Sequence, residues 1–347
     1  MFGSDTSFPN EVIDAAKKML GGGDQDGTPL HDAASEGSVE DMRSLLDEGA
    51  SAHKTDEYGR TPLHLAARGN PEAVKVLLEE GADHSAVDED EKTPLHEAAN
   101  EGSPESVELL LEEGADPTRK SDPGWTPLHR AASTESVKTV QRLLDEGADV
   151  DSVSSSNSWD APDATPLYEA ASRGHHEIVS ELLERGADPT VSDDLGKSPL
   201  HEAARAGSAE SVQTLLEHGA DPSRMSNSGK APIHLAATSE SVQKMQLLLD
   251  AGADPERTDE RGDVPISEAL ESGSTETVKL LLEKGADPTQ SNSDGKAPIH
   301  AAASSGSAEM VKLLVEAGAD PERTDERGNA PILGASESGS IETVKLL

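Results

Sequence analysis

A four-residue pattern, Thr-Pro-Leu-His or a close variant, recurs ten times along this chain of 347 residues at an almost constant interval. Its prolines are Pro29, Pro62, Pro94, Pro127, Pro166, Pro199, Pro232, Pro265, Pro298 and Pro331. Seven of the nine intervals are 33 residues, one is 32 and one is 39. A period of this length indicates a small structural unit stacked on copies of itself, which grows in one dimension without a single central core.

Each repeat predicts two short helices followed by a polar loop, as residues 198–230 illustrate. Ser198 suits an N-cap because its hydroxyl accepts a backbone N–H bond, and Pro199 suits the first helical position. Gly207 breaks the chain, and apolar residues at i, i+3 and i+4 between 212 and 216 form one face of a second helix. The polar stretch 221–230, with a proline and a glycine, predicts a turn or hairpin.

This pattern resembles the ankyrin repeat: T-P-L-H, then A-A, a short turn, L-L and G-A-D. The resemblance implies an all-α solenoid, with two antiparallel helices and a short β-hairpin loop in each repeat. We expect an N-terminal capping helix and linker over residues 1–27 and a repeat domain over residues 28–347. Because the chain stops inside the tenth repeat without a polar cap, we expect it to continue in a longer native protein.

The charge balance argues against several classes of partner. Lysine and arginine number 29 and aspartate and glutamate 68, which gives a formal net charge of −39. Such a surface repels phosphate backbones and anionic membranes. The excess carboxylates fit either adaptation to high salt or an acidic surface for a basic partner. With no cysteine and no signal-like start, the sequence predicts a monomeric cytoplasmic protein without disulfides or thiolate chemistry.

The recurring histidines and carboxylates do not indicate catalysis. Equivalent histidines of neighbouring repeats are about 10 Å apart, too far to share a zinc ion, and the resemblance implies that they tie the hairpin to the helix start. Acidic runs such as Asp88–Glu91 lack the spacing of a calcium loop. The sequence has no phosphate-binding or nucleophile motif. We therefore predict no catalytic, cofactor or metal site and no enzymatic activity.

The 39-residue interval points to an insertion in one hairpin. Six extra residues lie between Gly147 and Thr165, within 152–162, and they include Trp159. The second tryptophan, Trp125, lies in the preceding hairpin. A tryptophan on an exposed loop is typical of an interface anchor. The alternatives are that Trp159 packs on its own repeat or that the serine-rich loop is disordered.

The resemblance also implies a binding surface, since ankyrin proteins usually contact partners through hairpin tips and the first helix. Carried onto this chain, those positions are Tyr58, Arg60, Asp90, Lys92, Trp125, Trp159, Arg173, Leu195, Lys197, Arg205, Asn227, Lys230 and Arg261. We therefore expect a scaffold that binds other proteins through its concave face and hairpin tips. The alternative is the repeat region of a larger enzyme or membrane protein whose active domain lies outside this chain.

Overall fold

The computed structural model describes residues 27–155, 163–239 and 241–347, so the capping helix expected within 1–27 lies outside the described residues apart from Gly27. Two helices form each repeat. The first helices are α2 (Pro29–Glu36), α4 (Pro62–Ala67), α6 (Pro94–Asn100), α8 (Pro127–Ala132), α10 (Pro166–Arg173), α12 (Pro199–Arg205), α14 (Pro232–Thr238), α16 (Pro265–Ser272), α18 (Pro298–Ser304) and α20 (Pro331–Glu337). The second helices are α3 (Val39–Asp47), α5 (Pro71–Glu79), α7 (Pro104–Glu112), α9 (Val137–Asp145), α11 (His176–Glu184), α13 (Ala209–Glu217), α15 (Val242–Asp250), α17 (Thr275–Glu283), α19 (Ala308–Glu316) and α21 (Ile341–Leu346).

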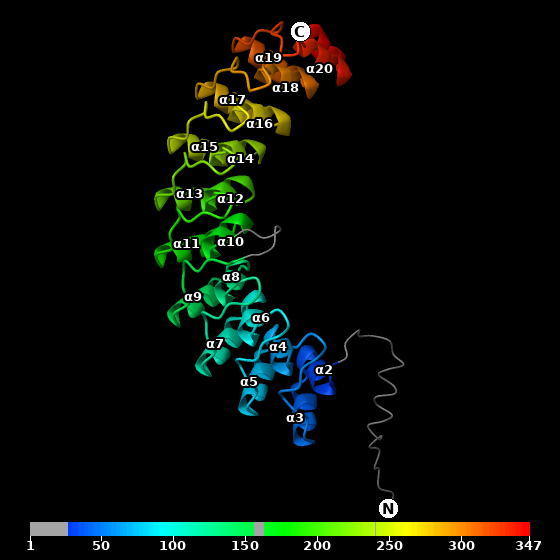
Figure 1. Cartoon of the computed structure of the whole chain (residues 1–347), viewed down its shortest axis with the longest axis vertical. Helices are drawn as coiled ribbons and strands as arrows, with labels where there is room; N and C mark the ends of the chain where they lie inside the picture. The colour runs from blue at the N-terminus through cyan, green and yellow to red at the C-terminus, as the bar shows by residue number, and fades with distance from the viewer. Residues whose placement is uncertain (1–26, 156–162, 240) are drawn as a thin grey trace, which may run out of the picture.

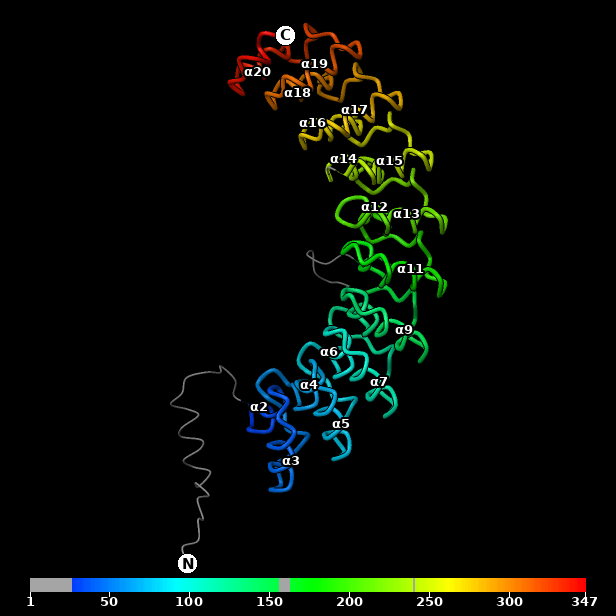
Figure 2. The backbone as a smooth tube through the Cα atoms, turned by 180° about the vertical axis from the view of Figure 1, so that it is seen from behind, coloured from blue at the N-terminus to red at the C-terminus, as the bar shows by residue number. Residues whose placement is uncertain are grey.

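The pairs stack into a curved solenoid, as the period predicts. The even-numbered helices line the concave side and the odd-numbered helices the convex side (Figure 1). The same arc is seen from behind in Figure 2. The sequence explains in part why the first helices line the concave side. Small side chains such as Ala203 and Ala204 let neighbouring first helices approach one another closely, whereas the second helices carry the longer leucines and valines.

A continuous core runs between the two rows of helices. It is built from the leucine or isoleucine after the motif proline, the alanine pair of the first helix and the apolar face of the second helix. Leu200, for example, is fully buried, as are Ala203, Ala204 and Leu215. Each layer buries its neighbour, so the stability of the solenoid is shared between adjacent repeats.

The loops form tight tips in a row beside the first helices. In the first repeat the backbone N–H of Asp56 donates to the carbonyl of Arg60 (2.9 Å), while the Asp56 carboxylate accepts the N–H groups of Tyr58 and Arg60. Because this side chain takes the remaining bonds, no ladder develops, and the described loops are hairpin turns without assigned strands. Backbone hydrogen bonds join consecutive tips, such as the one from the N–H of Glu89 to the carbonyl of Tyr58 (3.0 Å).

The insertion leaves the base of its hairpin closed. The N–H of Ser154 donates to the carbonyl of Ala164 (2.9 Å), and the N–H of Ala164 donates to the Ser154 hydroxyl (2.9 Å). Ser154 therefore takes the role that Asp56 has in the first repeat. The tip bond also persists, from Ser155 N–H to the Pro123 carbonyl (3.2 Å). The extra length thus enters at the tip, and Trp159 lies outside the described residues.

Six of the seven motif histidines link their first helix to the next hairpin; the exception is His234, whose Nε2 has no hydrogen-bond partner. In the second repeat His64 Nδ1 accepts the backbone N–H of Thr61 (3.1 Å), and Nε2 donates to the carbonyl of Lys92 (3.0 Å). The Thr61 hydroxyl lies 2.9 Å from the same Nδ1, so it bonds to the ring as well. At Thr165, where tyrosine replaces histidine, the hydroxyl instead accepts the N–H of Tyr168 (3.2 Å), the capping role expected from the sequence.

The four C-terminal repeats lack parts of this link. Ala231, Val264, Ala297 and Ala330 replace the threonine, and Ser267 and Leu333 replace two histidines. Removing the hydroxyl loses its bond to the ring, and removing the histidine also loses the bond to the next loop. Each missing bond lowers stability by about 1 kcal/mol.

We therefore expect the C-terminal third to open first. Amide hydrogen exchange followed by mass spectrometry is expected to show faster exchange for buried amides of residues 231–347 than for those of residues 61–200. The comparison uses equivalent positions of the second helices, which span nine residues in every repeat but the last. Slower exchange in the C-terminal segment would contradict this order.

Candidate functional site

Apart from Trp159, which lies outside the described residues, the sequence-predicted positions lie on the first helices and in the row of tips. Tyr58 and Leu195 are exposed at tips, and the Tyr58 ring carries the Arg60 guanidinium above it, 4.8 Å from the ring centroid. Asn227 belongs to the same row, because its side-chain amide donates to the carbonyl of Asp194 (2.9 Å). Arg261 continues it, with its carbonyl accepting the N–H of Ser293 (2.9 Å).

Several predicted positions are engaged in ion pairs. Arg60 pairs with Asp56 (2.8 Å), and Lys92 pairs with Asp90 (2.6 Å). Lys230 reaches forward to Glu268 on α16, with 2.5 Å between Nζ and the carboxylate oxygen. These ion pairs hold the basic side chains beside their acidic partners.

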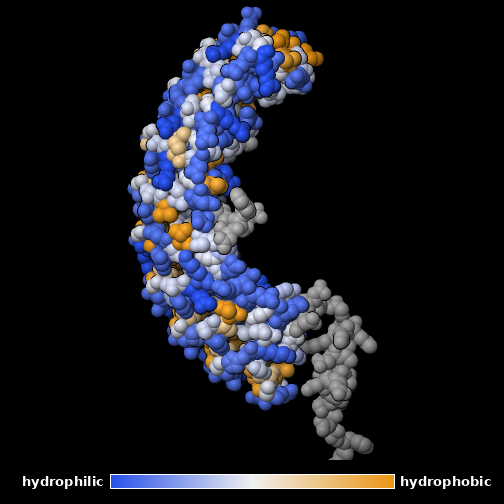
Figure 3. Space-filling model, in the orientation of Figure 1, coloured by the Kyte–Doolittle hydropathy of each residue, from blue (hydrophilic) through white to orange (hydrophobic). Residues whose placement is uncertain are grey.

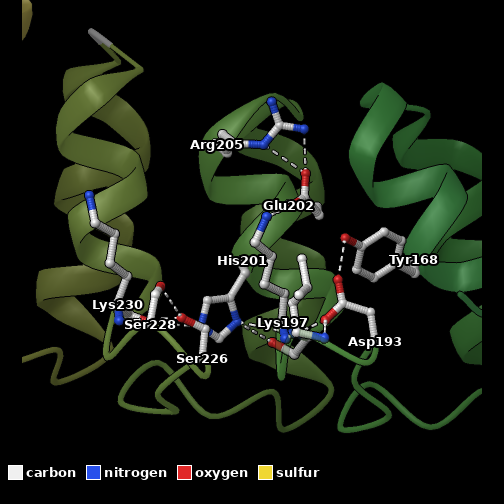
Figure 4. Close-up of polar contacts among 11 residues, drawn as sticks. Tyr168, Asp193, Lys197, His201, Glu202, Arg205, Ser226, Ser228 and Lys230 are labelled. Carbon is white, nitrogen blue, oxygen red and sulfur yellow. Dashed lines mark hydrogen bonds and ion pairs between the residues drawn. The ribbon is translucent and has the colours of Figure 1, made fainter. Parts of the chain in front are cut away.

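Lys197 and Arg205 meet on one buried carboxylate. Glu202 on α12 accepts Lys197 Nζ (3.3 Å) and Arg205 Nε (2.8 Å), as Figure 4 shows. Burial works to raise the pKa of the Glu202 carboxyl, but the bonds and charges of Arg205 and Lys197 outweigh it and hold that pKa below its ordinary value. The carboxylate thus stays ionised beneath two cations.

Tyr168 lies beside this group and replaces the motif histidine of its repeat. Its hydroxyl donates to the carboxylate of Asp193 in the following hairpin (2.9 Å) (Figure 4). Burial, and then the carboxylates of Glu202 and Asp193, raise the pKa of Tyr168, so the phenol remains a donor. The link from helix to hairpin is therefore kept with different chemistry.

Trp125 and Arg130 form a stacked pair at the centre of the concave side. The Arg130 guanidinium lies 4.4 Å from the centroid of the Trp125 ring, which also lies near His129. Burial lowers the pKa of Arg130, and the carboxylates of Glu97 and Glu169 oppose that shift. Sequence reasoning singled out Trp125 but missed Arg130. Its signal is its place directly after the motif histidine, where it lies on the concave surface of α8.

Arginines continue along the same surface on either side. Arg68 pairs with Glu97 of the next repeat (3.0 Å), and Arg173 lies 4.0 Å from Glu169 within α10. Arg173 was predicted from sequence, whereas Arg68 was missed. Arg130, Arg173 and Arg205 belong to α8, α10 and α12, and Arg68 directly follows α4, all in the concave row of helices (Figure 1); we call the concave surface of α4, α6, α8, α10 and α12 the arginine face.

The described residues contain no group of three histidine or carboxylate side chains arranged to hold a metal ion. Both ring nitrogens of motif histidines such as His64 and His201 are engaged in hydrogen bonds. No helix of the described segments is long and apolar enough to cross a bilayer.

A family model for ankyrin repeats matches five overlapping segments, residues 7–88, 69–154, 153–226, 223–292 and 266–347. The chain belongs to the ankyrin repeat family. The crystal structure of the human ASB11 ankyrin repeat domain is similar to this ankyrin solenoid, with 31% sequence identity and a TM-score of 0.59. That similarity covers 66% of this chain and 100% of the ASB11 domain. No curated protein matches the chain.

The family assignment confirms the predicted fold. Ankyrin repeats generally mediate protein–protein interaction, and this places the chain in that broad functional class.

Proposed function

We propose that this protein is a non-catalytic scaffold that binds other proteins through the arginine face and the adjoining hairpin tips. The observation that carries the proposal is the pairing of Trp125 and Arg130 at the centre of the concave side. Tryptophan and arginine are the residue types enriched at the energetic centres of protein interfaces. The proposal includes a monomer in the cytoplasm, as predicted from the sequence.

The chemistry of the concave side supports binding rather than catalysis. Its buried carboxylates are held beside basic groups, as Glu202 is by Lys197 and Arg205, and the motif histidines serve the stack. A general base needs a free lone pair within reach of substrate. The exposed tip residues Tyr58 and Leu195 add apolar contact area next to this charged surface.

Affinity capture at matched salt tests the surface. The tagged chain is compared with a Trp125→Ala, Arg130→Ala variant and with Lys312→Ala, a change on the convex helix α19, each checked for folding by circular dichroism. We expect partners retained by Lys312→Ala to be lost from the concave variant. Retention by the concave variant and loss by the convex control would contradict the proposal. Trp159→Ala, tested in parallel, shows whether the insertion contributes.

A further inference from the structure

Along the arginine face the cations lie outermost and the carboxylates lie beneath them. The side chains of Arg68, Arg173 and Arg205 are 47%, 51% and 49% exposed. Their glutamate neighbours Glu97, Glu169 and Glu202 are only 11%, 12% and 3% exposed. A ligand approaching this surface therefore meets guanidinium groups first.

The guanidinium groups retain free donors. Arg68 contacts Glu97 through Nε, which leaves both terminal nitrogens for a ligand, and Arg173 is 4.0 Å from its carboxylate. Each guanidinium has five N–H donors in a planar fork that matches a carboxylate. Arg130 is held flat by stacking on Trp125. Arg68, Arg173 and Arg205 are about half exposed, whereas Arg130 is less open to solvent because of its stacking and burial.

The local charge runs against that of the molecule. The chain carries −39, and its convex helices end in exposed glutamates such as Glu79 and Glu112. At physiological salt a charge is felt over about 8 Å, so a ligand on the concave side responds mainly to the groups beside it. Lys92, in the hairpin before α6, forms an ion pair with the exposed Asp90, so this pair carries no net charge. On α10 and α12, by contrast, the carboxylates that pair with Arg173 and Arg205 are largely buried, so the exposed member of each pair is the cation.

We propose that the arginine face binds an extended segment of a partner protein that carries carboxylate side chains at intervals of about three residues. Arg130, Arg173 and Arg205 stand on three successive layers, each about 10 Å from the next. A polyproline II chain rises about 3.1 Å per residue and repeats every three residues, so side chains of one face recur every ~9.3 Å. One carboxylate then meets one arginine in each layer. This inference rests on the proposed function and names the chemistry of its partner.

Synthetic peptides test the spacing and the charge. The probe is a fluorescein-labelled nine-residue peptide, Glu-Pro-Ser repeated three times, followed by fluorescence anisotropy in 0.15 M KCl. Comparison peptides carry lysine in place of glutamate, or the same residues with the three glutamates adjacent. We expect the spaced glutamate peptide to bind several-fold more tightly than either one.

Two matched triple variants separate the local surface from net charge. Arg130→Gln, Arg173→Gln, Arg205→Gln removes three concave cations, and Lys279→Gln, Lys284→Gln, Lys312→Gln removes three cations from the convex side. The concave variant is expected to weaken binding tenfold or more, from up to about fivefold for each arginine. The convex variant is expected to change it less than twofold. Circular dichroism confirms that both are folded, and single arginine variants replace the triple if it is not.

Three outcomes would overturn the inference: preference for the lysine peptide, equal weakening by the two triple variants, or equally tight binding of a nine-nucleotide oligothymidylate. The last result would mean that the face responds to negative charge alone. If the peptides fail while captured partners are still lost from the Trp125→Ala, Arg130→Ala variant, the proposed function stands and the acidic partner does not.

Discussion

Acidification from pH 7 to pH 5 is expected to destabilise the solenoid strongly. Burial lowers the pKa of His96, His129 and His201 to about 4, from an ordinary value of 6.5. Burial also lowers the pKa of His64 and His234. The geometry agrees with this direction, because Nδ1 of each ring accepts a backbone N–H bond, which requires that nitrogen to be unprotonated.

The direction of this pH dependence of stability follows from the linkage between proton binding and folding. Each of these histidines has a folded pKa below its unfolded value, so its stabilising contribution is fully present above pH 6.5 and is lost as the pH falls toward 4. The loss is about 2 kcal/mol for each histidine with a pKa near 4 between pH 7 and pH 5. Three such losses are comparable with the whole stability of an ordinary domain. The buried carboxyls of Glu169 and Asp193 act in the opposite direction, because burial raises their pKa.

Thermal unfolding followed by circular dichroism at half-unit pH steps measures this dependence. The net charge of −39 supplies an internal control. Acid removes negative charge, so a chain limited by self-repulsion would gain stability on acidification. We expect the melting temperature to fall instead. A melting temperature that stays level or rises between pH 7 and pH 5 would show that the histidine links do not govern stability.

Truncating one core isoleucine is expected to have the second large effect. Ile233 follows the motif proline of α14 and is 1% exposed. Ile233→Ala removes buried methyl groups and leaves a cavity between two layers, which lowers the free energy of unfolding by about 2–5 kcal/mol. Because repeats are coupled only to their neighbours, the damage is expected to uncouple the repeats on either side.

The chain offers a matched control at the equivalent position of the last described repeat. Ile332 follows the motif proline of α20 and is 43% exposed, so Ile332→Ala is expected to cost less than about 1 kcal/mol. Apolar side chains gather at this C-terminal end of the surface (Figure 3). Urea unfolding measures both variants. Equal losses would show that burial between layers does not set the cost.

The sequence predicts the stacked helix pairs well because each repeat carries its own local signals for helix starts and helix faces. The motif proline recurs ten times and the Gly-Ala pair nine times, so the sequence predicts helix starts and helix faces well, and the family comparison confirms the fold. The histidine links were expected only through the resemblance. Their acceptors lie in the hairpin that follows the second helix, 29 residues away in the case of His96 and Trp125, and no local pattern reveals such a bond.

The arginine face was only partly predictable. Arg173 and Arg205 were found by position, but Arg68 and Arg130 were not, because single basic residues among many acidic ones give no pattern in one dimension. These arginines are distinguished by how far their side chains are exposed relative to the neighbouring carboxylates. Glu97 lies beneath Arg68 although 29 residues separate them, and only the stacked geometry shows which charge faces outward.

The closed base of the fourth hairpin, which follows α9, makes that tip a site where length is free to vary. Nine residues join Ser154 to Ala164, whereas three join Asp56 to Arg60, and the same backbone bond closes both turns. The entropy of closing a loop grows only slowly with its length. A segment exchanged between residues 155 and 163 therefore changes what the protein presents to its surroundings while the neighbouring layers keep their register. This hairpin is a natural grafting point, where new recognition elements can be acquired without redesigning the stack.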